Sequence, residues 1–193
     1  MTAGRKILSS KKDWCTPPKY VNAVRSFFGE IELDPCSNDN SIVNAKTEYV
    51  LPKKDGLKES WDYNTIYVNP PYGIDKERKT SIRDWTKRCT DANSEYGSEV
   101  LALIPVAVNT RHWKQHIFGR ARAVCFLADT RLKFINGKND KGAPMACAMV
   151  YWGKNYRKFY KLFSLFGAVI DLSELIEREW VSSDCIKKQM HTV

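Results

Sequence analysis

The four residues Asn69-Pro70-Pro71-Tyr72 combine the groups that could hold a planar amino group for methylation. The asparagine side-chain oxygen and a proline carbonyl can accept hydrogen bonds from both hydrogens of an –NH₂ group, while the tyrosine ring stacks on the flat group carrying it. Because both hydrogens are then engaged, conjugation of the nitrogen weakens and its lone pair can attack an activated methyl group. The alternative is a plain Pro-Pro turn at a strand end, which requires neither the asparagine nor the tyrosine.

The residues around this motif predict where it lies in the fold. Residues 66–68 directly precede it and are typical of a short buried strand. Ligands of open α/β sheets bind at the carboxyl edge of the strands, so the motif is expected at a ligand-binding edge. Two acidic turns are candidates for the same edge, namely Asp34-Pro35 at the end of a strand over residues 31–35 and Asp55-Gly56 in an irregular connection.

Strands and helices alternate along the chain. Further strands are predicted at residues 100–105, 123–127 and 145–152, the last reached through a Gly-rich loop at residues 136–144, and any second strand within residues 44–61 is expected to be short. Helices are predicted at residues 19–28, 82–93 and 109–118, the first bounded by prolines and a glycine. The alternation predicts an α/β fold with a mainly parallel sheet and helices on both faces.

The chain has 193 residues, which is enough for one domain with a substantial core. Lys plus Arg number 31 against 22 Asp plus Glu, a net charge of +9 that favours nucleic acid as a partner. The six cysteines form no C-x-x-C pair, so free thiols in a reducing compartment are expected. The sequence shows no secretory signal and no membrane span, and a soluble intracellular protein is therefore predicted.

An ordered set of short motifs resembles the phage-type DNA N-6-adenine methyltransferases, a compact Dam-like family that uses S-adenosylmethionine. The resemblance spans residues 14–152, and each fragment alone is weak. Its elements are Trp14-x-Thr16-Pro17, Leu33-Asp34-Pro35, Asn44-Ala45-Lys46 with Tyr49, Asp55-Gly56-Leu57 with Trp61, Val68-Asn69-Pro70-Pro71-Tyr72, Trp85, Leu103-Ile104-Pro105 and Arg131-Leu132-Lys133-Phe134.

The resemblance implies a Rossmann-like class I methyltransferase fold, in which a sheet of about seven strands is mostly parallel and the last strand is antiparallel. It assigns Thr16 and Pro17 to the methionine end of the cofactor, with Asp34 and Pro35 beside them, and Asp55 to the cofactor adenine. A carboxylate at Asp34 would attract the cationic amino and sulfonium groups. For both aspartates the alternative is a turn residue. The turn after the first strand, Cys36-Ser37-Asn38, lacks the glycine-rich run of larger DNA methyltransferases. The same turn in the compact family also lacks it.

The implied reaction is methyl transfer from S-adenosylmethionine to the N6 amine of an adenine flipped out of double-stranded DNA, leaving S-adenosylhomocysteine. Asn69 and Pro70 would supply the two acceptors, and Tyr72 the stacking surface, with Pro71 completing the motif. Basic residues in two loops are candidates for phosphate contact, although any one of them is more simply a solvated charge. They are Lys76, Arg78, Lys79, Arg83, Arg131 and Lys133, together with Arg111, Lys138 and Lys141.

No metal ligand set is expected, because His112 and His116 have no third ligand nearby and are interpreted as surface histidines. Three functions compete. The first is the DNA methylation described above. The second is methylation of RNA or of a protein glutamine amide, by enzymes that carry the same motif. The third is DNA binding by an inert protein on this fold. Charge favours nucleic acid, and the intact Asn69 and Tyr72 argue against the inert protein.

Three segments are predicted. Residues 1–12 form a flexible basic arm, residues 13–153 the methyltransferase domain and residues 154–193 a helical extension packed on it. In the extension, aromatic residues from Tyr156 to Phe166 and a segment at 173–180 have helical spacing, and the aromatic stripe is expected to point inward. The resemblance implies a phage or prophage protein acting in the cytoplasm of a bacterial host.

Overall fold

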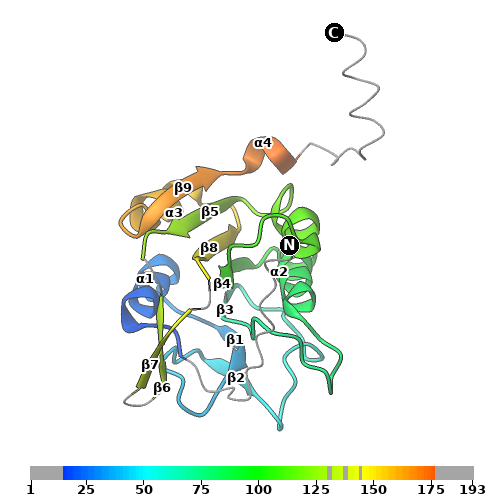
Figure 1. Cartoon of the computed structure of the whole chain (residues 1–193). Coiled ribbons are helices and arrows are strands. Elements are labelled where there is room, and N and C mark those ends of the chain that lie inside the picture. Colours follow the sequence, from blue (N-terminus) through cyan, green and yellow to red (C-terminus); the bar gives the residue numbers. More distant parts are fainter. Residues whose placement is uncertain (1–14, 130–131, 137–138, 144, 177–193) are drawn as a thin grey trace.

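The computed structural model describes residues 15–129, 132–136, 139–143 and 145–176, and it places them around a seven-stranded sheet. The strand order is β2-β1-β3-β4-β8-β5-β9, with a separate two-stranded hairpin β6-β7 (Figure 1). The sheet strands are β1 (Leu33–Ser37), β2 (Thr47–Val50), β3 (Thr65–Val68), β4 (Glu99–Pro105), β5 (Ala123–Leu127), β8 (Cys147–Trp152) and β9 (Gly167–Asp171). The hairpin strands and helices are β6 (Lys133–Asn136), β7 (Asn139–Gly142), α1 (Pro18–Phe28), α2 (Ile82–Tyr96), the π-helical turn η1 (Trp113–Ile117), α3 (Tyr156–Phe163) and α4 (Ser173–Ile176).

The sheet is parallel in one half and antiparallel in the other. β1 pairs in parallel with β2 and β3, and β3 with β4. β8 is antiparallel to both β4 and β5, and β9 is antiparallel to β5. The prediction of a mixed α/β protein is thus confirmed, but the expectation of one final antiparallel strand needs correction. Two strands, β8 and β9, run against the other five.

Helices cover both faces of the sheet, and each face has its own core. α1 and α3 pack on one face, where Phe27, Phe159 and Phe163 are buried with inward side chains of the central strands such as Tyr67 and Tyr151. α2 and η1 cover the opposite face, where Trp85 and Trp113 are buried with the alternate strand residues (Figure 1). Because successive strand residues point to opposite faces, the continuously apolar strand β4 supplies both cores.

The ends of the first two long helices follow from local sequence. Pro18 opens α1, where a missing N–H costs nothing, and Gly29 ends it with φ +81°, a conformation that glycine adopts without strain. At the start of α2, the Asp84 carboxylate accepts from the Ser81 backbone N–H at 2.7 Å and from the Ser81 hydroxyl at 3.1 Å. Both helices begin and end close to their predicted bounds.

Three local predictions differ from the structure. Residues 136–144 were expected as a loop, but β7 lies there and pairs with β6. The helix predicted over residues 109–118 is shorter, spanning residues 111–117, and most of it is the π-helical η1. The strand β8 is followed by another strand, because β9 lies in the segment expected to be helical and occupies the sheet edge beside β5. The helices α3 and α4 flank it, and Phe159 and Phe163 point inward as predicted.

Two further findings concern the chain as a whole. In the part of the chain that the structure describes, no helix is long and apolar enough to cross a bilayer. The five cysteines within the described ranges are free thiols, namely Cys15, Cys36, Cys89, Cys125 and Cys147. The basic arm at residues 1–12 and the end of the tail, from residue 177, lie outside the described residues.

Candidate active site

The ends of β1 and β3 bring the Asp34-Pro35 segment next to the Asn-Pro-Pro-Tyr motif. Both residues lie within β1, so the prediction of a turn at Asp34-Pro35 is wrong. The two strands are parallel neighbours, with Leu33 opposite Ile66. Following this register, the Asn69 backbone N–H hydrogen-bonds the Cys36 sulfur. The two segments predicted to bind cofactor and target therefore lie side by side at the carboxyl edge of the sheet, although 33 residues separate Cys36 from Asn69.

Asn69 keeps its carboxamide available for a ligand. Its side chain is half-buried, and within the described residues no hydrogen bond reaches its carboxamide oxygen or nitrogen. The following residue, Pro70, is buried, and no donor among the described residues takes its carbonyl oxygen. Both groups that were expected to accept from an amino group thus retain acceptor capacity.

Tyr72 is held by contacts of both its hydroxyl and its ring. Its hydroxyl donates to the Leu103 carbonyl at 3.3 Å and lies 3.7 Å from the Cys147 sulfur. The Phe134 ring meets it edge to face, with 5.7 Å between the ring centroids. Enclosure raises the pKa of the tyrosine hydroxyl, with a further contribution from the Cys147 thiol. The ring is therefore a neutral, fixed surface.

Thr16 and Pro17 enter the site from the segment before α1. The Thr16 hydroxyl is buried and lies 2.7 Å from the Tyr67 hydroxyl of β3. Pro17 is the residue before the helix, and its carbonyl accepts from the Tyr20 N–H at 3.0 Å. The structure thus attaches the predicted cofactor segment directly to the strand that carries the Asn-Pro-Pro-Tyr motif.

Asp34 is buried in β1, only 4% exposed. Its carboxylate accepts from the Cys36 backbone N–H at 3.1 Å. Burial, together with the negative charge of Glu48, its register partner in β2, raises the pKa of Asp34 to about 7. A cation arriving at this carboxylate would favour its ionised form, so the residue can attract positive charge near neutral pH.

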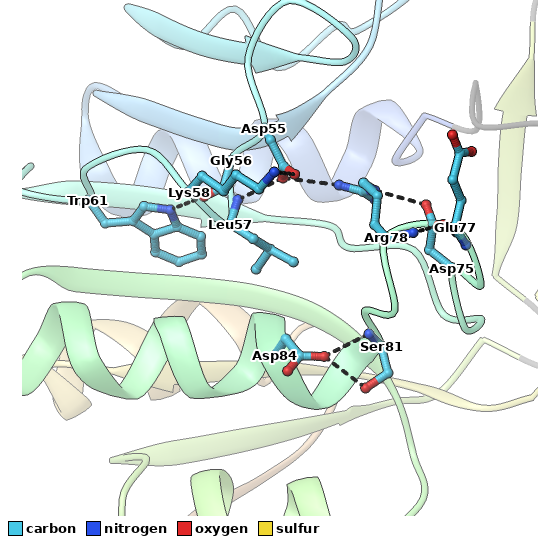
Figure 2. Close-up of polar contacts among 10 residues, drawn as sticks. All are labelled: Asp55, Gly56, Leu57, Lys58, Trp61, Asp75, Glu77, Arg78, Ser81 and Asp84. Atoms are coloured by element: carbon cyan, nitrogen blue, oxygen red, sulfur yellow. Dashed lines mark hydrogen bonds and ion pairs between the residues drawn. The ribbon is translucent and has the colours of Figure 1, made fainter.

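The turn Asp55-Gly56 packs on the end of β1. Gly56 is buried and lies so close to Pro35 that an added β-carbon would be 1.7 Å from the Pro35 carbonyl oxygen. The Trp61 indole N–H donates to the Gly56 carbonyl at 2.7 Å and holds the turn from the other side (Figure 2). The structure therefore brings Asp55 and Pro35, both predicted cofactor residues, into one neighbourhood.

Asp55 also contacts a residue predicted to bind DNA. Its Oδ1 accepts from the Leu57 backbone N–H at 3.2 Å and from Arg78 Nη1 at 3.0 Å, while Lys58 Nζ lies 3.8 Å from Oδ2. Arg78 Nε donates in turn to Asp75 Oδ2 at 2.9 Å (Figure 2). The guanidinium lies between two carboxylates, so phosphate contact by Arg78 remains a prediction that would require it to leave them.

The other predicted DNA contacts are exposed. Lys76 and Lys79 lie in the segment directly after Tyr72, and Arg83 lies in the first turn of α2. Lys133 is exposed in β6, next to the Phe134 that contacts Tyr72. Positive side chains thus come from two segments that flank the tyrosine ring. The candidates Arg131 and Lys138 lie outside the described residues, as does the side chain of Lys141.

The histidine pair is not a surface feature. His112 is 7% exposed, and its Nδ1 lies 2.9 Å from the Thr110 hydroxyl. Burial, together with the neighbouring His116, lowers the pKa of His112 to about 4. The prediction of surface histidines is therefore wrong for His112, whose side chain is buried. Across the described ranges, no group of three metal-binding side chains occurs.

Several residues of the site were not anticipated from the sequence in these roles. The Cys36 thiol joins the two strand ends, and burial together with the Asp34 charge raises its pKa. Phe134 was quoted as part of a motif, but its contact with Tyr72 depends on the β6-β7 hairpin. The Asp55–Arg78 pair joins two segments 23 residues apart. These contacts depend on packing between distant segments, which local sequence patterns do not encode.

The arrangement combines three chemical capacities at one edge of the sheet. A buried carboxylate at Asp34 can attract a cation, the Asn69 and Pro70 oxygens can accept hydrogen bonds, and the fixed Tyr72 ring can stack on a flat group. Exposed lysines beside the ring can bind a polyanion. No covalent nucleophile is needed for a reaction in which a bound amine attacks an activated donor.

A family model described as DNA N-6-adenine-methyltransferase (Dam) matches residues 4–178, which is most of the chain. No curated protein and no solved structure gives a match.

Proposed function

The chain belongs to the DNA N-6-adenine-methyltransferase (Dam) family, and from this premise we propose that it methylates the N6 amine of a flipped adenine in duplex DNA, with S-adenosylmethionine as methyl donor. The family indicates methylation of DNA adenine in general. The donor, base flipping and the residue roles are our assignments. The observation that carries them is the half-buried Asn69 carboxamide, whose polar atoms have no partner among the described residues and which adjoins the end of β1.

The residues at the end of β1 fit the cationic part of S-adenosylmethionine. The buried Asp34 pays a desolvation cost when ionised, which a methionine ammonium or a sulfonium would offset. At Asp55, Arg78 and Leu57 take Oδ1, while among the described residues Oδ2 has only the exposed Lys58 at 3.8 Å and can accept from an adenine amino group. We assign Thr16, Pro17 and Pro35 to the walls between these two carboxylates.

The Asn-Pro-Pro-Tyr residues orient the target amine in this proposal. The Asn69 side-chain oxygen and the Pro70 carbonyl accept the two amino hydrogens, and the Tyr72 ring stacks on the base. When bound, S-adenosylmethionine would supply an activated methyl group to the amine nitrogen, with S-adenosylhomocysteine as the leaving group, and the amine proton would pass to water. The protein contributes orientation and electrostatics, chiefly by fixing Tyr72 through Leu103 and Phe134.

The exposed surface beside Tyr72 supports base extrusion from DNA. Lys76 and Lys79 can hold the phosphate backbone. Between them and the tyrosine lies Ile74, whose side chain is 76% exposed. An apolar side chain presented among basic residues is suited to enter the base stack and fill the space that the flipped adenine leaves. We therefore assign Ile74 to the extrusion step.

The proposal extends to the architecture. The order of β1, β3, β4, β8 and β5, with β8 inserted antiparallel, supports a Rossmann-like class I methyltransferase fold with an added edge strand β9. We assign residues 13–153 to the catalytic domain, residues 1–12 to a basic arm and residues 154–193 to an extension. The contact of Phe159 and Phe163 with Phe27 of α1 supports packing of this extension on the domain.

Methyl transfer from labelled S-adenosylmethionine tests the proposal directly. Wild-type protein is incubated with duplex DNA, with structured RNA and with a protein extract, and the labelled product is digested to nucleosides or amino acids. Labelled N6-methyladenine from DNA is expected. Label confined to RNA or to glutamine would replace DNA as the substrate, and S-adenosylmethionine that binds without transfer to any of the three would support the inert DNA-binding protein.

A further inference from the structure

The segment between Tyr72 and α2, residues 73–80, is a compact turn, and it is called the target loop below. Asp75 and Thr80 pair as an isolated antiparallel bridge, with Asp75 N–H to Thr80 carbonyl at 2.8 Å and the reverse bond at 3.1 Å. Asp75 Oδ1 also accepts from the Glu77 and Arg78 backbone N–H groups at 3.1 and 3.0 Å. These bonds tie residues 75–80 of the loop to one another.

Arg78 is the residue through which the target loop reaches the cofactor side of the site. Its guanidinium donates to Asp75 within the loop at 2.9 Å and to Asp55 outside it at 3.0 Å (Figure 2). The side chains of Arg78, Asp55 and Asp75 are only 17, 14 and 18% exposed. This contact is partly buried, and one guanidinium bonds two carboxylates. It therefore differs from an exposed ion pair, which contributes little to stability.

Asp55, at the other end of this connection, is held in place by the turn to which it belongs. Asp55 belongs to the turn whose Gly56 lies against the Pro35 carbonyl and accepts from the Trp61 indole. A displacement of the Asp55 carboxylate is therefore passed to Arg78 and, through Asp75, to the whole target loop. That loop carries Ile74, Lys76 and Lys79, the residues assigned to DNA.

We propose that Arg78 is a positioning residue that couples occupation of the cofactor site to the placement of the target loop on DNA; this inference rests on the proposed function. A cofactor adenine bound to Asp55 restrains the same carboxylate that holds Arg78. The loop is then held in its DNA-binding position, and DNA held by the loop restrains Asp55 in return. Such a coupling is reciprocal, so each ligand raises the affinity for the other by the same factor.

The coupling is measured as the dissociation constant of S-adenosylhomocysteine with and without saturating duplex DNA, by calorimetry at fixed salt. For wild-type protein we expect DNA to tighten binding by at least about fivefold. In Arg78→Gln the ratio of the two constants should fall to between about 1 and 2. Asp75→Asn, which keeps an oxygen for the loop amides but removes the carboxylate that holds Arg78 Nε, should lower the ratio as well.

The matched control is Lys58→Gln, which removes another positive charge from Asp55. Lys58 lies 3.8 Å from Asp55 Oδ2, but its side chain is 81% exposed and it belongs to the same turn as Asp55. It provides no connection to the target loop, so the wild-type ratio should be retained. Arg78→Lys keeps the charge but cannot hold both carboxylates with a planar fork, and an intermediate ratio is expected.

Each result decides the inference. A wild-type ratio near 1, or an Arg78→Gln ratio equal to wild type, overturns it. A purely structural pair would lower the thermal midpoint of Arg78→Gln while leaving the ratio intact. Should Arg78→Gln fail to fold, Asp75→Asn and Arg78→Lys carry the comparison. Failure of the proposed function is a separate outcome, because wild-type protein would then give no labelled N6-methyladenine whatever the binding ratio.

Discussion

Gly56 lies directly against the backbone carbonyl of Pro35, and a β-carbon at this glycine would come within 1.7 Å of the oxygen. Strand β1 and the Asp55-Gly56 turn therefore meet at residues 21 positions apart in the chain, without a side chain between them. Asp34 directly precedes Pro35 and Asp55 directly precedes Gly56, so the spacing of these two carboxylates depends on how closely the turn approaches the strand.

The first prediction concerns this contact. Gly56→Ala should lower the free energy of unfolding by roughly 2–4 kcal/mol, because the turn must move away from Pro35, and it should weaken cofactor binding about tenfold. Urea unfolding and calorimetry measure the two effects. Gly97→Ala is the control, since Gly97 has φ +74° but no atom near its added β-carbon. It should cost about 1 kcal/mol and leave cofactor binding unchanged. Equal effects at the two glycines would refute the role of the contact.

The second prediction concerns Asn69. Asn69→Ala should reduce the rate of methyl transfer by about 10²- to 10³-fold, because one acceptor of the target amine is lost. The fold and the affinity for S-adenosylhomocysteine should stay within about twofold of wild type, since the Cys36 contact uses the Asn69 backbone. Single-turnover rates with saturating cofactor measure the chemical step. A loss of less than about fivefold would exclude Asn69 from orienting the amine.

The third prediction is a pH dependence from Asp34. Its pKa is raised to about 7 in the folded protein, so between pH 4 and 7 the folded chain holds a proton that the unfolded chain has released. The free energy of unfolding should therefore fall as pH rises through this window and level off above it. At pH 8, Asp34→Asn should be more stable than wild type by about 1–3 kcal/mol. Urea unfolding at a series of pH values checks the sign, and a wild-type stability that rises from pH 5 to 7 relative to Asp34→Asn would contradict it.

Asp34 also predicts how cofactor affinity changes with pH. A cationic ligand favours the ionised carboxylate, so the affinity for S-adenosylmethionine should rise from pH 5.5 to 7.5, by up to tenfold for each pH unit below the pKa. In Asp34→Asn the affinity should be weaker and nearly constant over this range. Subtracting the variant's profile removes the titration of the ligand itself. Parallel profiles for the two proteins would exclude Asp34 from the cation site.

The fourth prediction concerns the lysines of the target loop. The double variant Lys76→Ala/Lys79→Ala should bind duplex DNA more weakly and reduce the slope of log affinity against log salt by about 2, as expected for two lost phosphate contacts. The control is Lys154→Ala/Lys161→Ala, which removes two exposed lysines in and just before α3. Its slope should match wild type. The assignment fails if both double variants change the slope equally.

The fifth prediction concerns Ile74. Ile74→Ala should lower the transfer rate on fully paired DNA about tenfold, because the extruded state loses the side chain that fills the stack. On a duplex in which the target adenine is mismatched, extrusion costs less and the defect should shrink. Leu165→Ala, at a residue 78% exposed between α3 and β9, is the control and should behave as wild type on both duplexes. A defect of equal size on paired and mismatched DNA would argue against a role in extrusion.

The order of the main elements followed from the sequence because hydrophobic periodicity and turn residues are local signals. Prolines and Gly29 bounded α1, and the apolar runs located β3, β4 and β5. The position of β8 between β4 and β5 depends on pairing between distant segments, which periodicity does not encode. β9 was missed for a related reason, since an edge strand with alternating exposure carries a weak apolar signal and follows a strongly amphipathic helix.

The site could be predicted only where its residues follow strand ends. Asp34 and Asn69 were expected at one sheet edge, and the pairing of β1 with β3 places their segments side by side. The partner of Arg78 could not be predicted, because a basic residue in a polar loop is usually solvated and nothing local distinguishes it from Lys76 or Lys79. The burial that sets the pKa of Asp34 likewise depends on the packed strands around it.

The insertion of β8 has a consequence for the nascent chain. β4 and β5 both precede β8 but do not pair with each other, so β5 has no sheet partner until Cys147–Trp152 leaves the ribosome. The Tyr72 hydroxyl lies beside the Cys147 sulfur at the start of that late strand. A polypeptide still in synthesis therefore lacks both a continuous sheet and the final support of its stacking ring, and catalytic competence should arise only after Trp152 has left the ribosome.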